Sequence, residues 1–313
     1  MAPTLVLVLA LLMDITLGEP PEKFHPTVWM GKVIAFLEPR MKNRDPRIER
    51  LNGVLLGLFV TTLFVVLVYL ILSLVDQLFG LVAFIVLAAI LLKTTFAVKC
   101  MGRFTLPIAM AVEQGNIDEA RRLLHHVVGR EVAKLNEQQI LSATVETISE
   151  GTVDGITSSL FYYVLFGVPG AIAFRVINTL DSMVGYRDRE HVNIGWFSAK
   201  LDTLANYVPA RITAFLMIVA TWFLREKYRD AWRILIRDRG KTGSLNAGWP
   251  MSTVAGALGV RLEKPGFYAL GEDTVTLSPK HIPRALRIME LTTYLFVALV
   301  TIPLSILNVM IIG

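Results

Sequence analysis

Long apolar runs alternate with polar blocks along this chain. Residues 51–75 and 291–313 contain no charged side chain, and each run exceeds the roughly 20 residues that cross a hydrocarbon core. With the shorter runs included, the apolar segments lie at about 3–17, 51–75, 78–98, 155–177, 208–224 and 291–312. Since a helix satisfies its own backbone hydrogen bonds inside a bilayer, the pattern predicts an all-α fold, a polytopic transmembrane helical bundle that forms a single integral membrane domain over 1–313.

Two places in these runs predict changes of direction. Residues 76–79, DQLF, separate the second run from the third so closely that the two segments should form a tight antiparallel hairpin. GVPG at 167–170 interrupts the fourth run. A proline between glycines either breaks a helix where its backbone lines a cavity or only kinks a span, and the sequence leaves both alternatives open.

The polar blocks predict the topology. They lie at 18–50, 99–154, 178–207 and 225–290. Lys and Arg are abundant in the first, second and last blocks, so the positive-inside rule places these as helical loops in the cytoplasm. Segments 155–177 and 208–224 must then either both span the membrane or both re-enter it. Block 178–207 faces outward in the first case and the cytoplasm in the second.

Composition supports a membrane protein of the cell membrane. The chain is 54% hydrophobic and 18% charged, and a soluble domain of this length would carry more charge. The net charge of +5 comes from basic residues beside apolar segments, so we expect a lipid bilayer and no nucleic acid as a partner. The apolar N-terminal run lacks a basic region and a small-x-small cleavage site, which indicates a retained membrane segment.

Three carboxylates precede the fourth apolar run at helical spacing. Glu146, Glu150 and Asp154 would lie on one face of a helix, where they repel one another unless a cation lies against them. Mg²⁺ that bridges phosphates is the expected cation, and these acids are candidate catalytic residues. A solvated helix face, or pairing with arginines of a neighbouring helix, is the alternative.

Further polar residues border the apolar segments. Asp181 is a fourth catalytic candidate and joins Glu150 and Asp154 as a candidate Mg²⁺ ligand, because ionisable groups at membrane depth usually serve function. The candidate substrate-binding residues are Asp14, Glu19, His25, Asn178, Arg187, Asp202, Asn206, Arg211, Asn246 and Trp249. The alternatives are hydrogen bonding between helices, a structural histidine, and close packing at the start of a helix at 246–250.

Several stretches together resemble one known family. They read LLMDITLGEPPEKFHPTVWMGKVI, VETISEGTVDG, RVINTLDSMVGYR, GWFSAKLDTLANYVPARITA and SLNAGWPMSTVAGALGVRL. In order and spacing they resemble the CbiB/CobD family of cobalamin biosynthesis, adenosylcobinamide-phosphate synthase, over essentially the whole chain. The resemblance implies a membrane ligase that uses ATP to join (R)-1-aminopropan-2-ol, or its O-phosphate, to the f-propionate carboxylate of adenosylcobyric acid.

The resemblance also implies partners and leaves two rival functions. Adenosylcobyric acid, aminopropanol or its phosphate, and other membrane enzymes of corrinoid assembly are the implied partners. A non-catalytic scaffold of the corrinoid pathway and a secondary transporter are the rivals, although a transporter should show matching halves with broken helices. Where the family usually has Gly-Asp-Pro this chain has Gly18-Glu19-Pro20, so the acid is retained. Gly151, Leu245 and Met251 depart from the family pattern and are poor catalytic candidates.

The separate blocks predict one shared site. Each candidate borders the end of an apolar segment, and a helical bundle brings such ends to one depth. We therefore expect a single cavity at the cytoplasmic face of the membrane, formed by Asp14, Glu146, Asn178, Asp181, Asp202 and Asn246.

Overall fold

The computed structural model describes residues 2–129, 131–186 and 188–312, with side chains as far as Leu307. Arg187, one of the candidate residues, lies outside the described residues. The fold is almost entirely helical, as the apolar pattern predicts. Contacts divide the chain into two compact units, and the sequence carries no sign of this division. The first unit comprises Met1–Ala97, Ser158–Asn206 and Val300–Gly313, and the second comprises Val98–Thr157 and Tyr207–Leu299.

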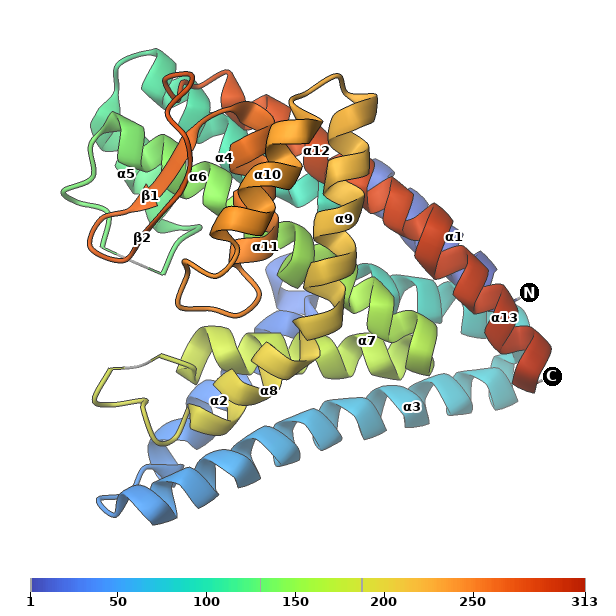
Figure 1. Ribbon diagram of the computed structural model, residues 1–313. Helices are drawn as coiled ribbons and strands as arrows, with labels where there is room; N and C mark the ends of the chain where they lie inside the picture. Colours follow the sequence, from blue (N-terminus) through green and yellow to red (C-terminus); the bar gives the residue numbers. More distant parts are fainter. Residues whose placement is uncertain (1, 130, 187, 313) are drawn as a thin grey trace. The chain divides into compact units, whose positions relative to one another are not determined.

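The first unit consists of helices that pack around α3 and α7. Its elements are α1 (Ala2–Thr16), a 3-10 turn (Glu22–Phe24), α2 (Pro26–Met41), α3 (Pro46–Lys93), α7 (Ser158–Val184), α8 (Trp196–Ala205) and α13 (Ile302–Ile312). Figure 1 shows these helices along the chain from blue to red. The core includes the fully buried side chains of Leu7, Ile34 and Leu56.

Helix α3 is broken at Gly80. This glycine has φ 76° and ψ −179°, a conformation that other residues rarely adopt, and helical geometry resumes after it. Figure 1 shows the ribbon turning back at this point, so the segments on either side of Gly80 run in opposite directions. The reversal predicted at DQLF therefore occurs directly after it.

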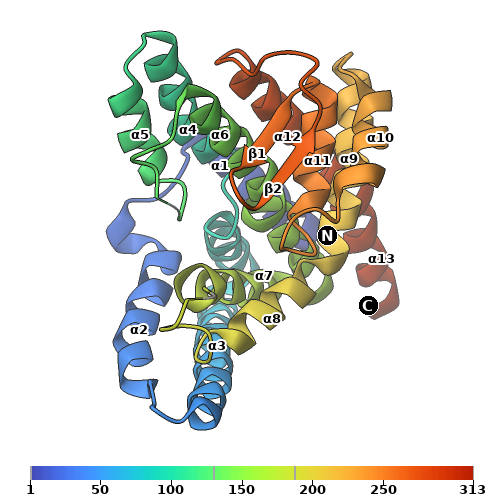
Figure 2. The same ribbon diagram turned by 60° about the vertical axis from the view of Figure 1, so that its left-hand side comes forward.

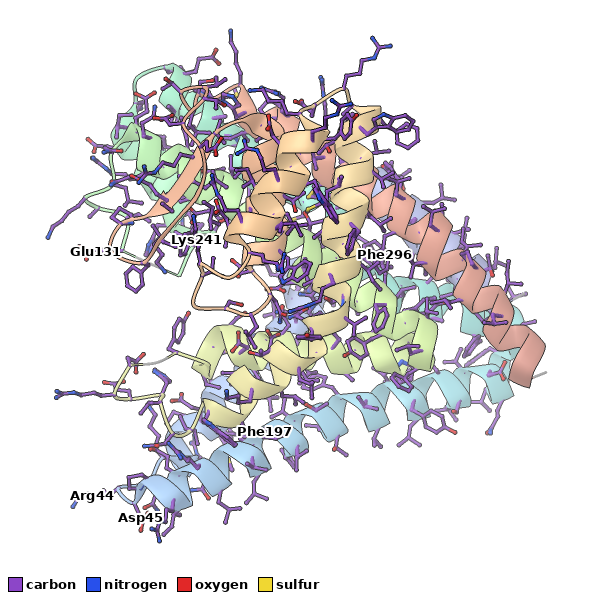
Figure 3. All side chains as sticks on the ribbon, in the orientation of Figure 1. Arg44, Asp45, Glu131, Phe197, Lys241 and Phe296 are labelled. Atoms are coloured by element: carbon purple, nitrogen blue, oxygen red, sulfur yellow. The ribbon has the colours of Figure 1, made fainter. Side chains whose placement is uncertain are left out.

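Helix α7 is broken at Gly167, within the GVPG stretch, with φ 67° and ψ −160°. The stretch thus breaks the helix rather than gently kinking it. Helix α7 packs with α8, and α8 in turn contacts α3 through Phe197, whose ring lies against Gly57 (Figure 3). Helix α8 therefore packs closely against the apolar helix α3.

The second unit contains the remaining helices and a small hairpin. Its elements are α4 (Val98–Glu113), α5 (Ile117–His125), α6 (Glu137–Thr152), a π-helical turn (Val153–Thr157), α9 (Tyr207–Phe223), α10 (Tyr228–Asp238), α11 (Gly248–Leu258), β1 (Arg261–Lys264), β2 (Tyr268–Gly271) and α12 (His281–Phe296). A second π-helical turn, Val297–Thr301, continues from α12. Asn136 caps α6 in a reciprocal capping box with Gln139, which fixes where this helix begins.

The antiparallel hairpin of β1 and β2 was not predicted from the sequence. Arg261 pairs with Gly271 and Lys264 with Tyr268, and the turn between them contains Pro265 and Gly266. Figure 2 shows the hairpin beside α6 and α11, which both contact it. Its position matters because it carries Lys264 and Tyr268 to the carboxylates of α6.

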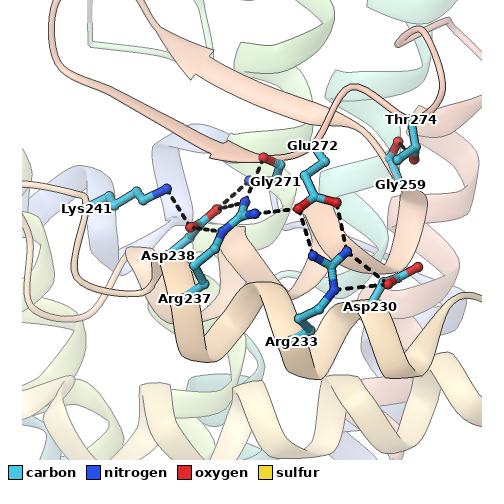
Figure 4. Close-up of polar contacts among 9 residues, drawn as sticks. All are labelled: Asp230, Arg233, Arg237, Asp238, Lys241, Gly259, Gly271, Glu272 and Thr274. Atoms are coloured by element: carbon cyan, nitrogen blue, oxygen red, sulfur yellow. Dashed lines mark hydrogen bonds and ion pairs between the residues drawn. The ribbon is translucent and has the colours of Figure 1, made fainter.

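A charged network joins α10 to the end of β2 (Figure 4). Asp238 is fully buried and accepts hydrogen bonds from the side chain of Arg237 and from the backbone N–H of Gly271, and it pairs with Lys241 at 2.6 Å. Glu272 accepts from both Arg233 and Arg237. Burial would raise the pKa of Asp238, but these donors outweigh burial and hold the pKa at about 2.

Three helical stretches are long and apolar enough to cross a membrane, within the described residues. They are Pro46–Glu113, Glu137–Val184 and His281–Leu307. Helices α8 and α9 pass the same test when they are taken together as one broken span, which makes a fourth candidate. The fold is therefore that of an all-α protein with three or four helices suited to a bilayer.

Candidate functional site

The three carboxylates of the predicted stripe line one cavity in the second unit. The cavity measures about 350 Å³, and Glu146, Glu150 and Asp154 lie along its wall. Its other lining residues are Met101, Val127, Val128, Gly129, Ala143, Thr147, Gly151, Lys264 and Tyr268. Asp154 lies in the π-helical turn that follows α6, a local widening that is frequent at functional sites. The cavity thus combines three acids with one lysine.

Glu146 is the most firmly held of the three acids. Its side chain is buried, Ser142 donates to Oε1 at 2.7 Å, and the Tyr268 hydroxyl donates to Oε2 at 2.9 Å. Ser142 in turn accepts from the backbone N–H of Glu263 at 2.7 Å. Because Glu263 and Tyr268 belong to the hairpin, the hairpin fixes this carboxylate. Glu150 is exposed and Asp154 half-buried, so solvent reaches both side chains.

The carboxylates of the cavity suit Mg²⁺, a hard cation whose remaining oxygen ligands can come from phosphate and water. Within the residues that the structure describes, no three His, Cys, Asp or Glu side chains are arranged to hold a metal ion. Mg²⁺ commonly needs only one or two carboxylates, because substrate phosphates and water supply its other ligands. Glu150 and Asp154 supply such oxygens. Asp181 lies in the first unit, half-buried with its carboxylate beside Gly185, and its place in a metal site stays a prediction.

In the first unit, Asp14, Glu19 and His25 lie around Lys93. The Lys93 ammonium pairs with Asp14 at 3.0 Å and with Glu19 at 2.6 Å, and it is only 5% exposed. His25 Nε2 lies 3.1 Å from Glu19. Burial raises the pKa of Glu19, but hydrogen bonds from His25 and Lys93 outweigh it and the pKa is lowered from its ordinary value. This cluster pairs a buried lysine with two carboxylates, which is the arrangement of a structural ion-pair network.

Asn178, Asp202 and Asn206 form a second polar network in the first unit. Asn178 and Asn206 both donate to the Asp202 carboxylate, at 3.2 and 3.0 Å. Arg175 donates to Asn178 and to the backbone carbonyl of Thr95. The network links α7 to α8 and to the residues that follow α3. Hydrogen bonding between helices, one of the alternatives from the sequence, therefore describes the observed contacts of these side chains.

Arg211, Asn246 and Trp249 lie together in the second unit. Arg211 donates to Asn246 Oδ1 at 2.7 Å, and its Cζ atom lies 4.8 Å from the centre of the Trp249 ring. Helix α11 begins at Gly248, as the NAGWP stretch predicts. These residues come from α9 and from the start of α11, two elements that pack against each other.

The six residues predicted to share one cavity are divided between the two units. Asp14, Asn178, Asp181 and Asp202 belong to the first unit, whereas Glu146 and Asn246 belong to the second. Convergence of all six side chains on one cavity, and its place at the cytoplasmic face, stay predictions.

Sequence reasoning missed several residues of these clusters. Lys93 and Arg175 lie inside runs that were treated as apolar, although a lone cation in such a run is itself a signal of buried ion pairing. Lys264 and Tyr268 reach the acidic cavity only through the hairpin. The Pro-Gly pair between them is a turn signal that could have revealed it.

Comparison with known proteins identifies relatives along nearly the whole chain. The family model described as CobD/Cbib protein matches residues 7–289. The chain is 38% identical to the "Probable cobalamin biosynthesis protein CobD" of Methanothermobacter thermautotrophicus, over 95% of this chain and 96% of that protein. It is 41% identical to the "Cobalamin biosynthesis protein CobD" of Dehalococcoides mccartyi, over 89% and 90% of the two chains.

A third relative is also named as a cobalamin biosynthesis protein. The "Cobalamin biosynthesis protein CobD" of Photorhabdus laumondii is 36% identical, over 91% of this chain and 92% of that protein. No solved structure shows significant similarity to the chain. The match of the family model over most of the residues, together with full-length relatives above 30% identity, shows that the chain belongs to the CobD/CbiB family.

Proposed function

We propose that this protein is the membrane enzyme of cobalamin biosynthesis that joins (R)-1-aminopropan-2-ol, or its O-phosphate, to the f-propionate carboxylate of adenosylcobyric acid at the expense of ATP. The names of its relatives support the pathway. The observation that carries the chemistry is the cavity lined by Glu146, Glu150 and Asp154. An amide ligase that handles phosphates needs such a group of carboxylates, and a passive scaffold has no use for it.

The size of the cavity suggests which substrate it takes. At about 350 Å³ it lies at the small end of ligand pockets, which run from about 300 to 1,000 Å³. An aminopropanol phosphate fits within such a volume, whereas a corrinoid does not. The corrinoid would therefore present only its propionate arm to the cavity. The ammonium group of the amine would pair with the acids, and Lys264 would contact the phosphate.

The reaction needs two group transfers. In the first, an oxygen of the propionate carboxylate attacks the γ-phosphorus of ATP, and ADP leaves. In the second, the amine nitrogen attacks the acyl carbon, the C–N bond forms and inorganic phosphate leaves. The amine must lose a proton before or during this attack, so a carboxylate must accept it. Glu150 is the proposed base because its carboxylate is exposed at the cavity wall, whereas that of Glu146 is buried.

Mg²⁺ fits this site as a cofactor that arrives with a phosphate. Asp154 would hold it, with phosphate oxygens and water as its other ligands, which leaves Glu150 to act as the base. When bound it would neutralise phosphate charge and favour departure of the leaving group. Glu146, fixed by the hairpin, would keep α6 in place so that its two neighbours along the helix point into the cavity. The cytoplasmic face is the proposed location because ATP is supplied there.

Activity of the purified protein tests the proposal. The protein in detergent would be given adenosylcobyric acid, aminopropanol or its phosphate, ATP and Mg²⁺, and the amide product measured by mass spectrometry. Glu150→Gln keeps the size of the side chain but removes its charge, and we expect at least a hundredfold loss, within the range of about 10²–10⁴ typical of a general base. Glu137→Gln is the matched control, because Glu137 is exposed at the start of the same helix and does not line the cavity.

The outcomes separate the proposed enzyme from its rivals. Product formed by the wild type and the Glu137 variant but not by the Glu150 variant supports the enzyme. No product from any protein, with corrinoid binding retained, would favour the scaffold. Accumulation of a labelled corrinoid or amine in sealed vesicles, without a new amide, would favour the transporter.

A further inference from the structure

Two arginines of the second unit share one indole ring. The Cζ atoms of Arg211 and Arg239 lie 4.8 and 5.2 Å from the centre of the Trp249 ring. Arg211 belongs to the first turns of α9, Arg239 directly follows α10, and Trp249 is the second residue of α11. The ring therefore gathers two positive charges from separate elements. Guanidinium groups stack favourably on aromatic faces, which explains how each is held there.

Arg211 is held firmly by neutral acceptors. Its guanidinium donates to the backbone carbonyl of Tyr207 and to Oδ1 of Asn246, both at 2.7 Å, and to the carbonyl of Leu245 at 3.2 Å. It also stacks on the Tyr207 ring at 3.5 Å. Asn246 is buried, so this anchor is rigid. These contacts fix the position of the charge without neutralising it.

Arg239 is placed by the close packing of its backbone. A Cβ atom on Gly248 would lie 2.1 Å from the carbonyl oxygen of Arg239, so only glycine allows the end of α10 to approach the start of α11 this closely. The half-buried Arg239 side chain donates to the carbonyl of Ile236 at 3.3 Å, which leaves most of its N–H donors for a ligand. Across the described residues, neither Arg211 nor Arg239 forms an ion pair with a carboxylate.

We propose that Arg211 and Arg239, stacked on Trp249, bind a phosphate group. Two like charges beside one ring repel each other, and a doubly charged anion that contacts both guanidinium groups would remove that repulsion. Guanidinium forks match phosphate oxygens in bidentate geometry, and stacking keeps the forks oriented. A soluble phosphate ester and a phospholipid headgroup present the same group, and the experiment below distinguishes these two sources. The proposal rests on the geometry of the second unit and does not depend on the reaction proposed for the acidic cavity.

Binding measured without turnover tests this site. Protein in a detergent that contains no phosphate would be titrated with inorganic pyrophosphate by calorimetry, and phosphatidylglycerol retained after reconstitution would be measured by native mass spectrometry. Arg239→Gln removes one fork and should weaken pyrophosphate binding about tenfold or more, the effect of losing a hydrogen bond to a charged group. Arg239→Lys keeps the charge but loses the fork, and should recover only part of the affinity.

The matched control is Arg229→Gln. Arg229 lies on α10, is exposed, and contacts only the neighbouring Tyr228 among the described side chains. Weaker pyrophosphate binding in the Arg239 variants, with the control unchanged, supports a soluble phosphate. Unchanged pyrophosphate binding with loss of retained phosphatidylglycerol in the same variants supports a lipid headgroup. If the Arg239 variants match the control in both measurements while their helical content is intact, the proposed site is refuted, whether or not the protein makes the amide.

Discussion

Replacement of Asp238 by asparagine should measurably destabilise the second unit. The Asp238 side chain is fully buried, and it receives the Arg237 guanidinium, the Lys241 ammonium and the Gly271 N–H. The pKa of this carboxyl falls from an ordinary 3.8 to about 2. Each pKa unit corresponds to about 1.4 kcal/mol, so the ionised form contributes about 2 kcal/mol to the free energy of unfolding at neutral pH.

The difference in stability between the wild type and Asp238→Asn should depend on pH. A carboxyl whose pKa is lowered by folding stabilises the protein fully above its ordinary pKa and loses that effect as pH falls toward its folded value. The difference between wild type and Asp238→Asn should stay constant from pH 8 to pH 5. By pH 3 it should fall to about half, because the wild-type carboxyl then begins to bind a proton in the unfolded chain.

Thermal unfolding in detergent, followed by intrinsic fluorescence, measures this difference. For a unit of this size a loss of about 2 kcal/mol should lower the apparent Tm by about 4–8 °C. Asp273→Asn is the control, since Asp273 is exposed and has no ion pair among the described residues. A variant at position 238 that unfolds within 1 °C of this control at pH 7, or a difference that persists undiminished to pH 3, would refute the reasoning.

The ion pairs of Lys93, the guanidinium group of Arg211 and the acids at 146–154 each lead to one further prediction. Lys93→Gln should destabilise the protein by about 3–5 kcal/mol, because the Asp14 carboxylate would stay buried, and that of Glu19 half-buried, without the lysine. An apparent Tm equal to that of Lys32→Gln, an exposed lysine, would contradict this. Arg211→Lys should raise the KM for a phosphorylated substrate about tenfold while kcat changes little, because lysine lacks the fork; an unchanged KM for every substrate would count against it. Removal of Mg²⁺ with a chelator should speed hydrogen exchange over residues 146–154, where carboxylates lie close together; equal exchange with and without Mg²⁺ would place the cation elsewhere.

The helices could be predicted from the sequence because their signals are local. Uncharged runs such as 51–75 leave helix as the structure that satisfies the backbone in a bilayer, and α3 covers this run. The start of α11 and the place where α7 is interrupted could also be predicted, since glycine and proline restrict or free the backbone at their own positions. Whether α7 is broken or only kinked there could not. The acidic face of α6 follows from helical periodicity alone.

The partners of the polar residues could not be predicted in this way. Lys93 lies 74 residues from Glu19 along the chain, and nothing in the apolar run around it points to that partner. Arg239 likewise meets Trp249 only because α10 and α11 pack closely at Gly248. Contacts of this kind depend on how elements pack, which the pattern of one sequence does not specify.

Gly80 has a consequence for how the chain enters the membrane. A continuous helix of the 48 residues of α3 would be about 72 Å long, more than twice the roughly 30 Å thickness of a hydrocarbon core. The turn at Gly80 instead returns the chain toward the side from which it came, so both ends of α3 can face the same aqueous compartment. The conformation of Gly80 thus decides whether the chain ends α3 on the same side of the bilayer as it began. A residue at position 80 that accepted only helical geometry would alter on which side of the bilayer the later segments are exposed.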